Sequence, residues 1–103
     1  MWAQMITMRL KPGREGELPK VAAQLRAAEQ PDSGLVHTTT TQDANDPSRV
    51  ITLVVFESEE KARERENDPR RQEGLQVARA TMMEIFEGGP EFTDLKVIDD
   101  WVL

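Results

Sequence analysis

The sequence predicts an α+β fold of the ferredoxin-like type: a four-stranded antiparallel sheet in the chain order β-α-β-β-α-β, with the helices on one face. Two strand–helix–strand patterns follow one another along the chain, and a hairpin signal joins them. The central strands are apolar on both faces, although two helices can cover only one face of such a sheet. The other face must therefore meet a second protein surface, most simply a second copy of the chain.

Size and composition limit the possible functions. The 103 residues suit one domain, residues 1–103. The net charge of −6 disfavours binding to nucleic acid, because an acidic surface repels phosphates. The lack of cysteine excludes disulfides, thiolate catalysis and Cys-ligated zinc. The sequence contains neither a signal-peptide pattern nor an apolar run long enough to span a membrane, so we expect a cytoplasmic protein.

The first unit is a strand followed by a helix. Residues 2–10 alternate as a strand does, and Lys-Pro-Gly at 11–13 ends it. A helix is expected from about 14 to 29, with apolar residues on one stripe. Because proline is best tolerated in a first turn, Pro19 indicates that the regular helix begins near Leu18.

A hairpin is expected in the middle of the chain. Residues 35–42 form its first strand and include four threonines in succession, so the period of two places two hydroxyls on each face. Residues 43–48 are dense in turn formers. Residues 50–56 are apolar nearly throughout, which is typical of a strand buried on both faces.

The second unit contains two helical pieces. Ser58 is a good N-cap for a short acidic helix. That helix should stop near Asn67, because Pro69 disfavours helical geometry in the residue before it. Asp68 and Pro69 then supply a capping carboxylate and a first-turn proline for a second helix.

The end of the chain completes the pattern. The second helix is expected to run to about Phe86, where Gly-Gly-Pro at 88–90 terminates it. The last strand is expected over about 93–98, followed by an acidic and apolar tail, 99–103. Docking of Trp101 across a subunit boundary would bury its large ring.

Several side chains could carry chemistry, each with a plainer alternative. His37 is the only histidine; imidazole can act as a general base, or this can be a strand residue without a role. The threonines around Thr39 can line a polar patch in a cavity or simply suit a strand. Met82 can form a pocket wall or helical core. Arg70 and Arg71 can bind an anionic ligand or be ordinary charged surface.

Short motifs over nearly the whole chain resemble the antibiotic biosynthesis monooxygenase-like domains. The motifs are Arg-Leu-Lys-Pro-Gly-Arg at 9–14, Ser-Gly-Leu at 33–35, Asp-Pro-Ser-Arg at 46–49 and Phe-Glu-Ser-Glu-Glu at 56–60. The resemblance implies a dimeric α+β barrel, two ferredoxin-like protomers joined through their sheets. Some members oxygenate aromatic polyketides without metal or flavin, and others degrade haem.

This chain departs from the family at three positions. Phe56 stands where many relatives have tryptophan, and Arg65 and Arg70 stand where histidine is frequent. Haem degradation needs an axial ligand from that helix, so we do not expect haem binding. Cofactor-free oxygenation survives these changes, because the electron-rich substrate itself reduces O₂. We therefore expect neither a cofactor nor a metal.

Two hypotheses follow. The first is a cofactor-independent monooxygenase, or a related enzyme modifying small aromatic or quinone-like molecules, that forms a homodimer through its sheet faces and its tail. The alternative is a non-catalytic dimeric domain that binds a small ligand or serves in stress. The candidate site residues are His37 as base, Arg65 and Arg70 as anion partners, and Phe56, Thr39 and Met82 in a substrate pocket.

Overall fold

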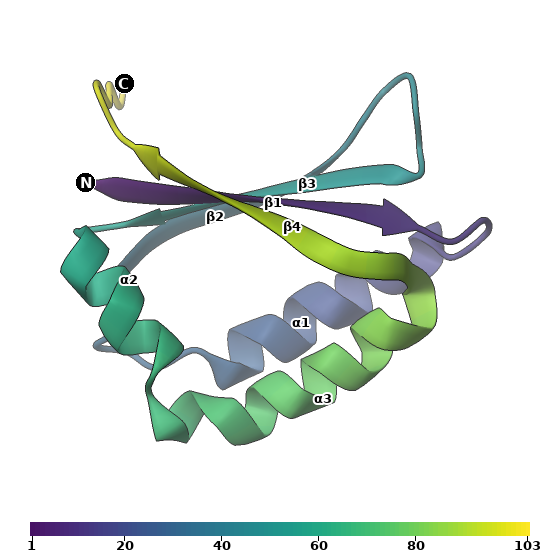
Figure 1. The fold of residues 1–103 in the computed structure, drawn as a ribbon, viewed down its shortest axis with the longest axis horizontal. Helices are drawn as coiled ribbons and strands as arrows, with labels where there is room; N and C mark the ends of the chain where they lie inside the picture. Colours follow the sequence, from purple (N-terminus) through teal and green to yellow (C-terminus); the bar gives the residue numbers. More distant parts are fainter.

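A computed structural model describes residues 1–103, and it confirms the predicted α+β ferredoxin-like fold. The four strands form one antiparallel sheet in the order β2-β3-β1-β4, and the helices lie together on one side of it (Figure 1). The strands are β1 (Trp2–Leu10), β2 (Leu35–Gln42), β3 (Arg49–Phe56) and β4 (Phe86–Lys96). The helices are the 3₁₀ turn η1 (Glu15–Glu17), α1 (Leu18–Ala28), α2 (Glu59–Glu66) and α3 (Pro69–Ile85).

The helices begin where local signals predict. Pro19 lies in the first turn of α1, after the 3₁₀ turn. The hydroxyl of Ser58 caps α2 by accepting a hydrogen bond from the Lys61 N–H at 3.1 Å. The carboxylate of Asp68 caps α3 by accepting from the Arg70 N–H at 2.9 Å. None of the helices has the length and apolar character needed to cross a bilayer.

The junction between α3 and β4 differs from the expectation. The helix ends at Ile85, and the strand begins at the next residue, Phe86, without a loop. The expected start of the last strand near residue 93 was therefore wrong. Burial explains the early start, because Phe86 is only 7% exposed and packs in the core beside Ile85. The Lys11 N–H also donates to the Ile85 carbonyl at 2.8 Å, which fixes the junction against the end of β1.

The Gly-Gly-Pro segment, residues 88–90, forms a bulge inside β4 instead of ending a helix. Thr7 of β1 pairs with Glu91, and Arg9 pairs with Glu87, so three residues of β4 lie opposite one residue of β1. Gly88 has a φ of +68°, a backbone conformation that suits glycine. The bulge bends β4 without breaking its pairing with β1.

The core on the helix-covered face consists of two separate groups. Val50 and Ile85 are completely buried in the larger group, at the end of the sheet where α3 meets β4. The smaller group lies under α2. The larger group contains Leu10, Val21, Val50, Ile85 and Phe86, and the smaller contains Val54, Phe56 and Ala62.

The opposite face of the sheet has no helix over it (Figure 1). We call it the open face; its apolar residues come from alternate positions of the two central strands and from Leu95 of β4. Leu53 is 39% exposed there, and its neighbours Ile51 and Val55 are half-buried. Within one chain, β3 is therefore buried on one face only. The apolar residues of the open face are Ala3, Met5, Ile51, Leu53, Val55 and Leu95.

Candidate ligand-binding site

A small cavity of about 40 Å³ lies between the helices and the covered face of the sheet. Its wall is almost entirely apolar and combines residues of α1 and α3 with residues of all four strands. Such a wall favours an apolar or aromatic ligand. The lining residues are Met8, Leu18, Val21, Ala22, Leu25, Thr40, Val50, Thr52, Met82 and Phe86.

Two threonine hydroxyls are the only polar side-chain groups of this interior cavity. Thr52 of β3 is 9% exposed, and its hydroxyl donates to the Thr40 hydroxyl of β2 across 3.3 Å. A hydroxyl carries one donor hydrogen, so the Thr40 hydrogen remains available for an oxygen of a ligand. The cavity therefore presents one directed donor in an apolar wall, and no ionisable side chain lines it.

Of the predicted pocket residues, Met82 lines this cavity and Phe56 does not. Met82 packs against the larger core group. Phe56 is 2% exposed and lies in the smaller group. The guanidinium carbon of Arg65 lies 5.3 Å from the centre of the Phe56 ring, a cation–π contact that closes this end of the interior.

His37 and Thr39 lie on the open face. The pairing partner of His37 is Val55 and that of Thr39 is Leu53, and the two polar side chains meet each other at 3.0 Å, Nε2 to Oγ1. A register shift between Leu35 and His37 causes this placement. Without it, His37 would share the helix-covered face with Leu35. The candidate base is therefore separated from the interior cavity by the sheet.

The two predicted anion partners already form ion pairs with carboxylates of the same chain. Arg65 pairs with Glu29, Nη2 to Oε1 at 2.7 Å, and both side chains are mostly buried. Arg70 is exposed and lies 2.9 Å from Asp32 and 2.6 Å from Asp68. Neither guanidinium is free for a ligand.

The six predicted site residues thus fall into separate places. Met82 alone lines the interior cavity, His37 and Thr39 share the open face, and the rest lie around α2 and the start of α3. Sequence reasoning missed Thr40 and Thr52 as the polar pair of the cavity. The signal was present, because strand alternation places Thr40 on the opposite face from Thr39.

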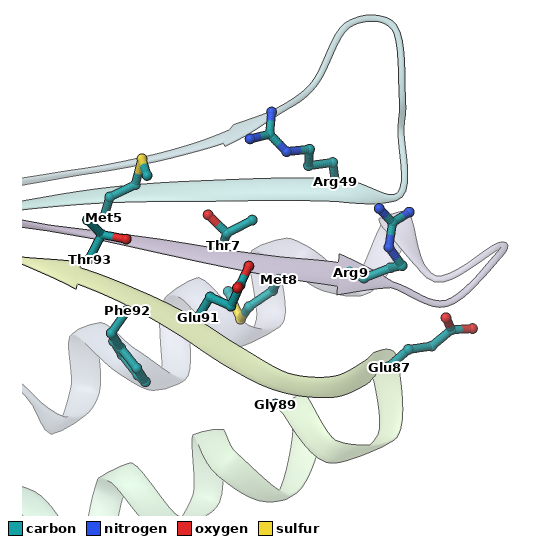
Figure 2. A pocket seen from close by; sticks show the side chains of 10 residues that line it. All are labelled: Met5, Thr7, Met8, Arg9, Arg49, Glu87, Gly89, Glu91, Phe92 and Thr93. Atoms are coloured by element: carbon teal, nitrogen blue, oxygen red, sulfur yellow. The ribbon is translucent and has the colours of Figure 1, made fainter.

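A larger, shallow hollow of about 600 Å³ lies beside the β4 bulge, and the close-up in Figure 2 shows its residues. Its rim carries both charges: Arg9 and Arg49 on one side, Glu87 and Glu91 on the other. The Arg9 guanidinium donates a hydrogen bond to the Ser48 hydroxyl, so one of its donors already has a partner. The hollow is therefore charged, whereas the interior cavity is mostly apolar and reaches solvent beside the exposed residues Thr40 and Leu25. No group of three or more His, Asp or Glu side chains is arranged to hold a metal ion.

The sequence matches the family model of the antibiotic biosynthesis monooxygenases over residues 1–76. The chain belongs to this family, as the motifs predicted. No functionally curated protein matches the sequence.

Solved structures share the fold at low sequence identity. NE2512 of Nitrosomonas europaea, a protein of unknown function, is 16% identical, with a TM-score of 0.74 and coverage of 99% of this chain and 93% of that one. Rv0793 of Mycobacterium tuberculosis is 16% identical, with a TM-score of 0.71 and 96% of each chain covered. A variant of SnoaB, a cofactor-independent oxygenase from Streptomyces nogalater, is 15% identical, with a TM-score of 0.72 and coverage of 96% and 94%.

Proposed function

We propose that this protein is a cofactor-independent monooxygenase acting on a small, electron-rich aromatic or quinone-like substrate in the interior cavity. The observation that carries the proposal is the apolar wall with a single hydroxyl pair, Thr40 and Thr52. Family membership and the likeness in fold to SnoaB, a cofactor-independent oxygenase, support it. The proposal needs no cofactor, because the substrate supplies the electrons.

The reaction balances with O₂ alone. In an anthrone-type substrate, a CH₂ group beside the aromatic rings loses a proton, and the resulting anion passes electrons to O₂. One oxygen atom becomes the oxygen of a new carbonyl group, and the other leaves as water with the two hydrogens of the CH₂ group. The carbon loses four electrons and O₂ gains four.

The chain would contribute an apolar environment and one donor. An apolar wall strengthens a hydrogen bond to an anionic oxygen, and the Thr40 hydroxyl, on the solvent-exposed side of the cavity, is placed to make one. The cavity has room for only a few water molecules, so an aromatic ligand must displace side chains. Met82 is flexible, and Leu25 is 36% exposed at the edge of the cavity. These two side chains form the expected entrance.

The group that removes the substrate proton depends on where the substrate binds, on the open face or in the interior cavity. His37 can serve as a base only for a ligand on the open face, because the sheet separates it from the cavity. In the interior, the substrate would enter already ionised or lose its proton to solvent at the entrance.

Oxygen uptake with anthrone and dihydroquinone substrates tests the proposal. Thr40→Val removes the donor at nearly constant volume and should lower kcat by about tenfold or more. Thr39→Val is its matched control on the other face of the same strand, and it should leave uptake unchanged. An absence of uptake above buffer over the whole panel, or equal effects of the two variants, would overturn the proposed site.

A second function is favoured by one observation: none of the residues that line the cavity can act as an acid or base near neutral pH. The chain would then be a non-catalytic dimeric domain that binds a small aromatic ligand or serves in stress. Tight binding of anthraquinone, detected by tryptophan fluorescence, without oxygen uptake from any substrate would support this function.

We also propose a cytoplasmic homodimer joined through the open faces and the C-terminal tails. The uncovered apolar residues of β1 and β3 supply the face. The tail supplies unburied apolar side chains: Ile98 is 92% exposed, Trp101 81% and Val102 82%. Sedimentation should report about twice the chain mass of 11.7 kDa. A folded monomer at micromolar concentration would contradict the homodimer.

A further inference from the structure

Arg71 is a half-buried cation with no acidic partner. It lies in the first turn of α3, one turn before the buried Leu75 and two turns before the buried Ala78, so it occupies the inner stripe of that helix. Its side chain makes no ion pair or hydrogen bond with the rest of the chain, whereas its neighbours Arg65 and Arg70 both do.

Close packing of α3 against α1 brings Arg71 near the ion pair of Arg65 with Glu29. A Cβ atom at Gly74 would lie 3.0 Å from that of Ala28, so the start of α3 is packed tightly against the end of α1. Arg65 and Glu29 are, in that order, the charged groups that act most strongly on Arg71.

Three carboxylates lie near Arg71, and each is already held by another arginine: Glu29 by Arg65, Glu66 by Arg63 and Asp68 by Arg70. Both oxygens of Glu29 are engaged by Arg65, at 2.7 to 3.1 Å. Burial lowers the pKa of Arg71, and repulsion from Arg65 and Arg79 lowers it further, although Glu29 and Glu66 attract it. The group remains charged, so a half-buried positive charge is left without a carboxylate in direct contact. A buried or half-buried guanidinium normally has one.

We propose that Arg71 binds an oxyanion of a small-molecule ligand, a carboxylate or a phosphate. The fork of a guanidinium matches the geometry of both groups. The site is distinct from the interior cavity, because Met82 lies three turns further along α3. The inference does not depend on the proposed oxygenase activity. Of the three arginines that the sequence offered as anion binders, Arg65, Arg70 and Arg71, it selects the one whose side chain has no ion pair within the chain.

Calorimetry and thermal unfolding test this site with two probes, benzoate and inorganic phosphate, and with benzamide as the uncharged control. At least one anion should bind and raise Tm, and benzamide should not. The probe that binds with the higher affinity shows whether the site prefers a carboxylate or a phosphate. Arg71→Met keeps most of the apolar stem and should weaken binding about tenfold or more, because a charge-assisted hydrogen bond is lost.

Folding of the variant is checked in the same measurement. Because Arg71 has no partner to lose, Arg71→Met without ligand should unfold at the same temperature as the wild type or higher. Arg26→Met removes an exposed arginine of α1 and controls for net charge; it should change affinity less than about twofold. Binding that is equal in Arg71→Met and the wild type, or no binding of either anion up to tens of millimolar, would overturn the site.

Discussion

Arg65 donates three hydrogen bonds to Glu29, with Nε at 3.0 and 3.1 Å from the two carboxylate oxygens and Nη2 at 2.7 Å from Oε1. The pair joins α2 to the residue that follows α1, and only 15% and 21% of the two side chains are exposed. Burial disfavours the charged form of Glu29, but the hydrogen bonds from Arg65 and Ser33 outweigh it and hold the pKa of Glu29 below its ordinary value.

The first prediction concerns this ion pair. Glu29→Gln should lower the free energy of unfolding by about 2 kcal/mol, because it leaves the Arg65 guanidinium mostly buried and without its counter-charge. Glu64→Gln is the matched control: Glu64 lies 3.8 Å from Lys61 and is 59% exposed, so its loss should cost less than about 0.5 kcal/mol. Urea unfolding measures both, and equal losses would contradict the prediction.

The same pair predicts a dependence on pH. Because the folded pKa of Glu29 is depressed, the unfolded chain takes up its proton first as the pH falls below the ordinary value of 4.5. The stabilisation from Glu29 is therefore fully present above pH 4.5 and is lost as the pH falls through the folded pKa. The difference in unfolding free energy between the wild type and Glu29→Gln should shrink in acid. A difference that stays constant from pH 7 to pH 3 would refute this.

Gly34 gives a second prediction, on stability. Its φ is +78°, and an added Cβ would lie 2.6 Å from the Cβ of Lys61 in α2. Gly34→Ala should cost about 2 to 4 kcal/mol, the sum of backbone strain and overpacking. Gly13 has the same φ of +78° with no atom within 4 Å, so Gly13→Ala should cost only the strain, about 1 to 2 kcal/mol. If Gly34→Ala and Gly13→Ala lower the unfolding free energy equally, α2 must move aside to make room for the added methyl group.

The third prediction separates the two faces of the sheet in ligand binding. Met82→Ala enlarges the interior cavity and should tighten the binding of a bulky ligand such as anthraquinone, while it lowers Tm because a partly buried side chain is truncated. His37→Ala should change neither the binding nor oxygen uptake. Ligand titration followed by fluorescence measures both. An effect of His37→Ala on binding would move the ligand to the open face.

The fourth prediction concerns self-association. Leu53→Asp places a charge in the middle of the open face and should convert the proposed dimer into a monomer. Val77→Asp is the control, because Val77 is 55% exposed on α3, away from the open face. Sedimentation should separate the two variants. A dimer that survives Leu53→Asp would show that the chains associate through another surface.

Deletion of residues 98–103 tests the tail in the same assay. If Trp101 docks across the subunit boundary, the truncated chain should dimerise more weakly, and its own fold should persist because residues 98–103 are all exposed. Unchanged dimerisation would remove the tail from the interface.

Local signals in the sequence predicted the element order and most boundaries. The caps at Ser58 and Asp68 and the prolines that follow helix starts act within one turn, so they can be read without knowledge of the fold. The start of β4 was missed because a strand can continue through Gly88–Pro90 when core contacts hold Phe86 in place. Core packing of Phe86 thus had a larger effect on the structure than the local preference of Gly88–Pro90 to end an element.

The candidate site was harder to predict than the fold, since it depends on which way each side chain points. The register shift between Leu35 and His37 reverses the alternation of β2, and nothing in the local sequence marks it. It carries His37 away from the helices and leaves Thr40 facing them. Ion pairs between distant segments, such as Arg65 with Glu29, cannot be predicted from local sequence, so the sequence named Arg71 as a possible anion binder but could not favour it over Arg65 and Arg70.

The bulge in β4 has one further consequence, for growth of the sheet beyond a single chain. On that border the bend at Gly88–Pro90 and the flanking carboxylates of Glu87 and Glu91 obstruct a neighbouring strand. The border formed by β2 carries no Asp, Glu, Lys or Arg side chain, but it has an irregularity of its own, the register shift between Leu35 and His37. Both borders of the sheet therefore carry an irregularity that disfavours backbone pairing between copies, which leaves the open face as the surface for the proposed dimer.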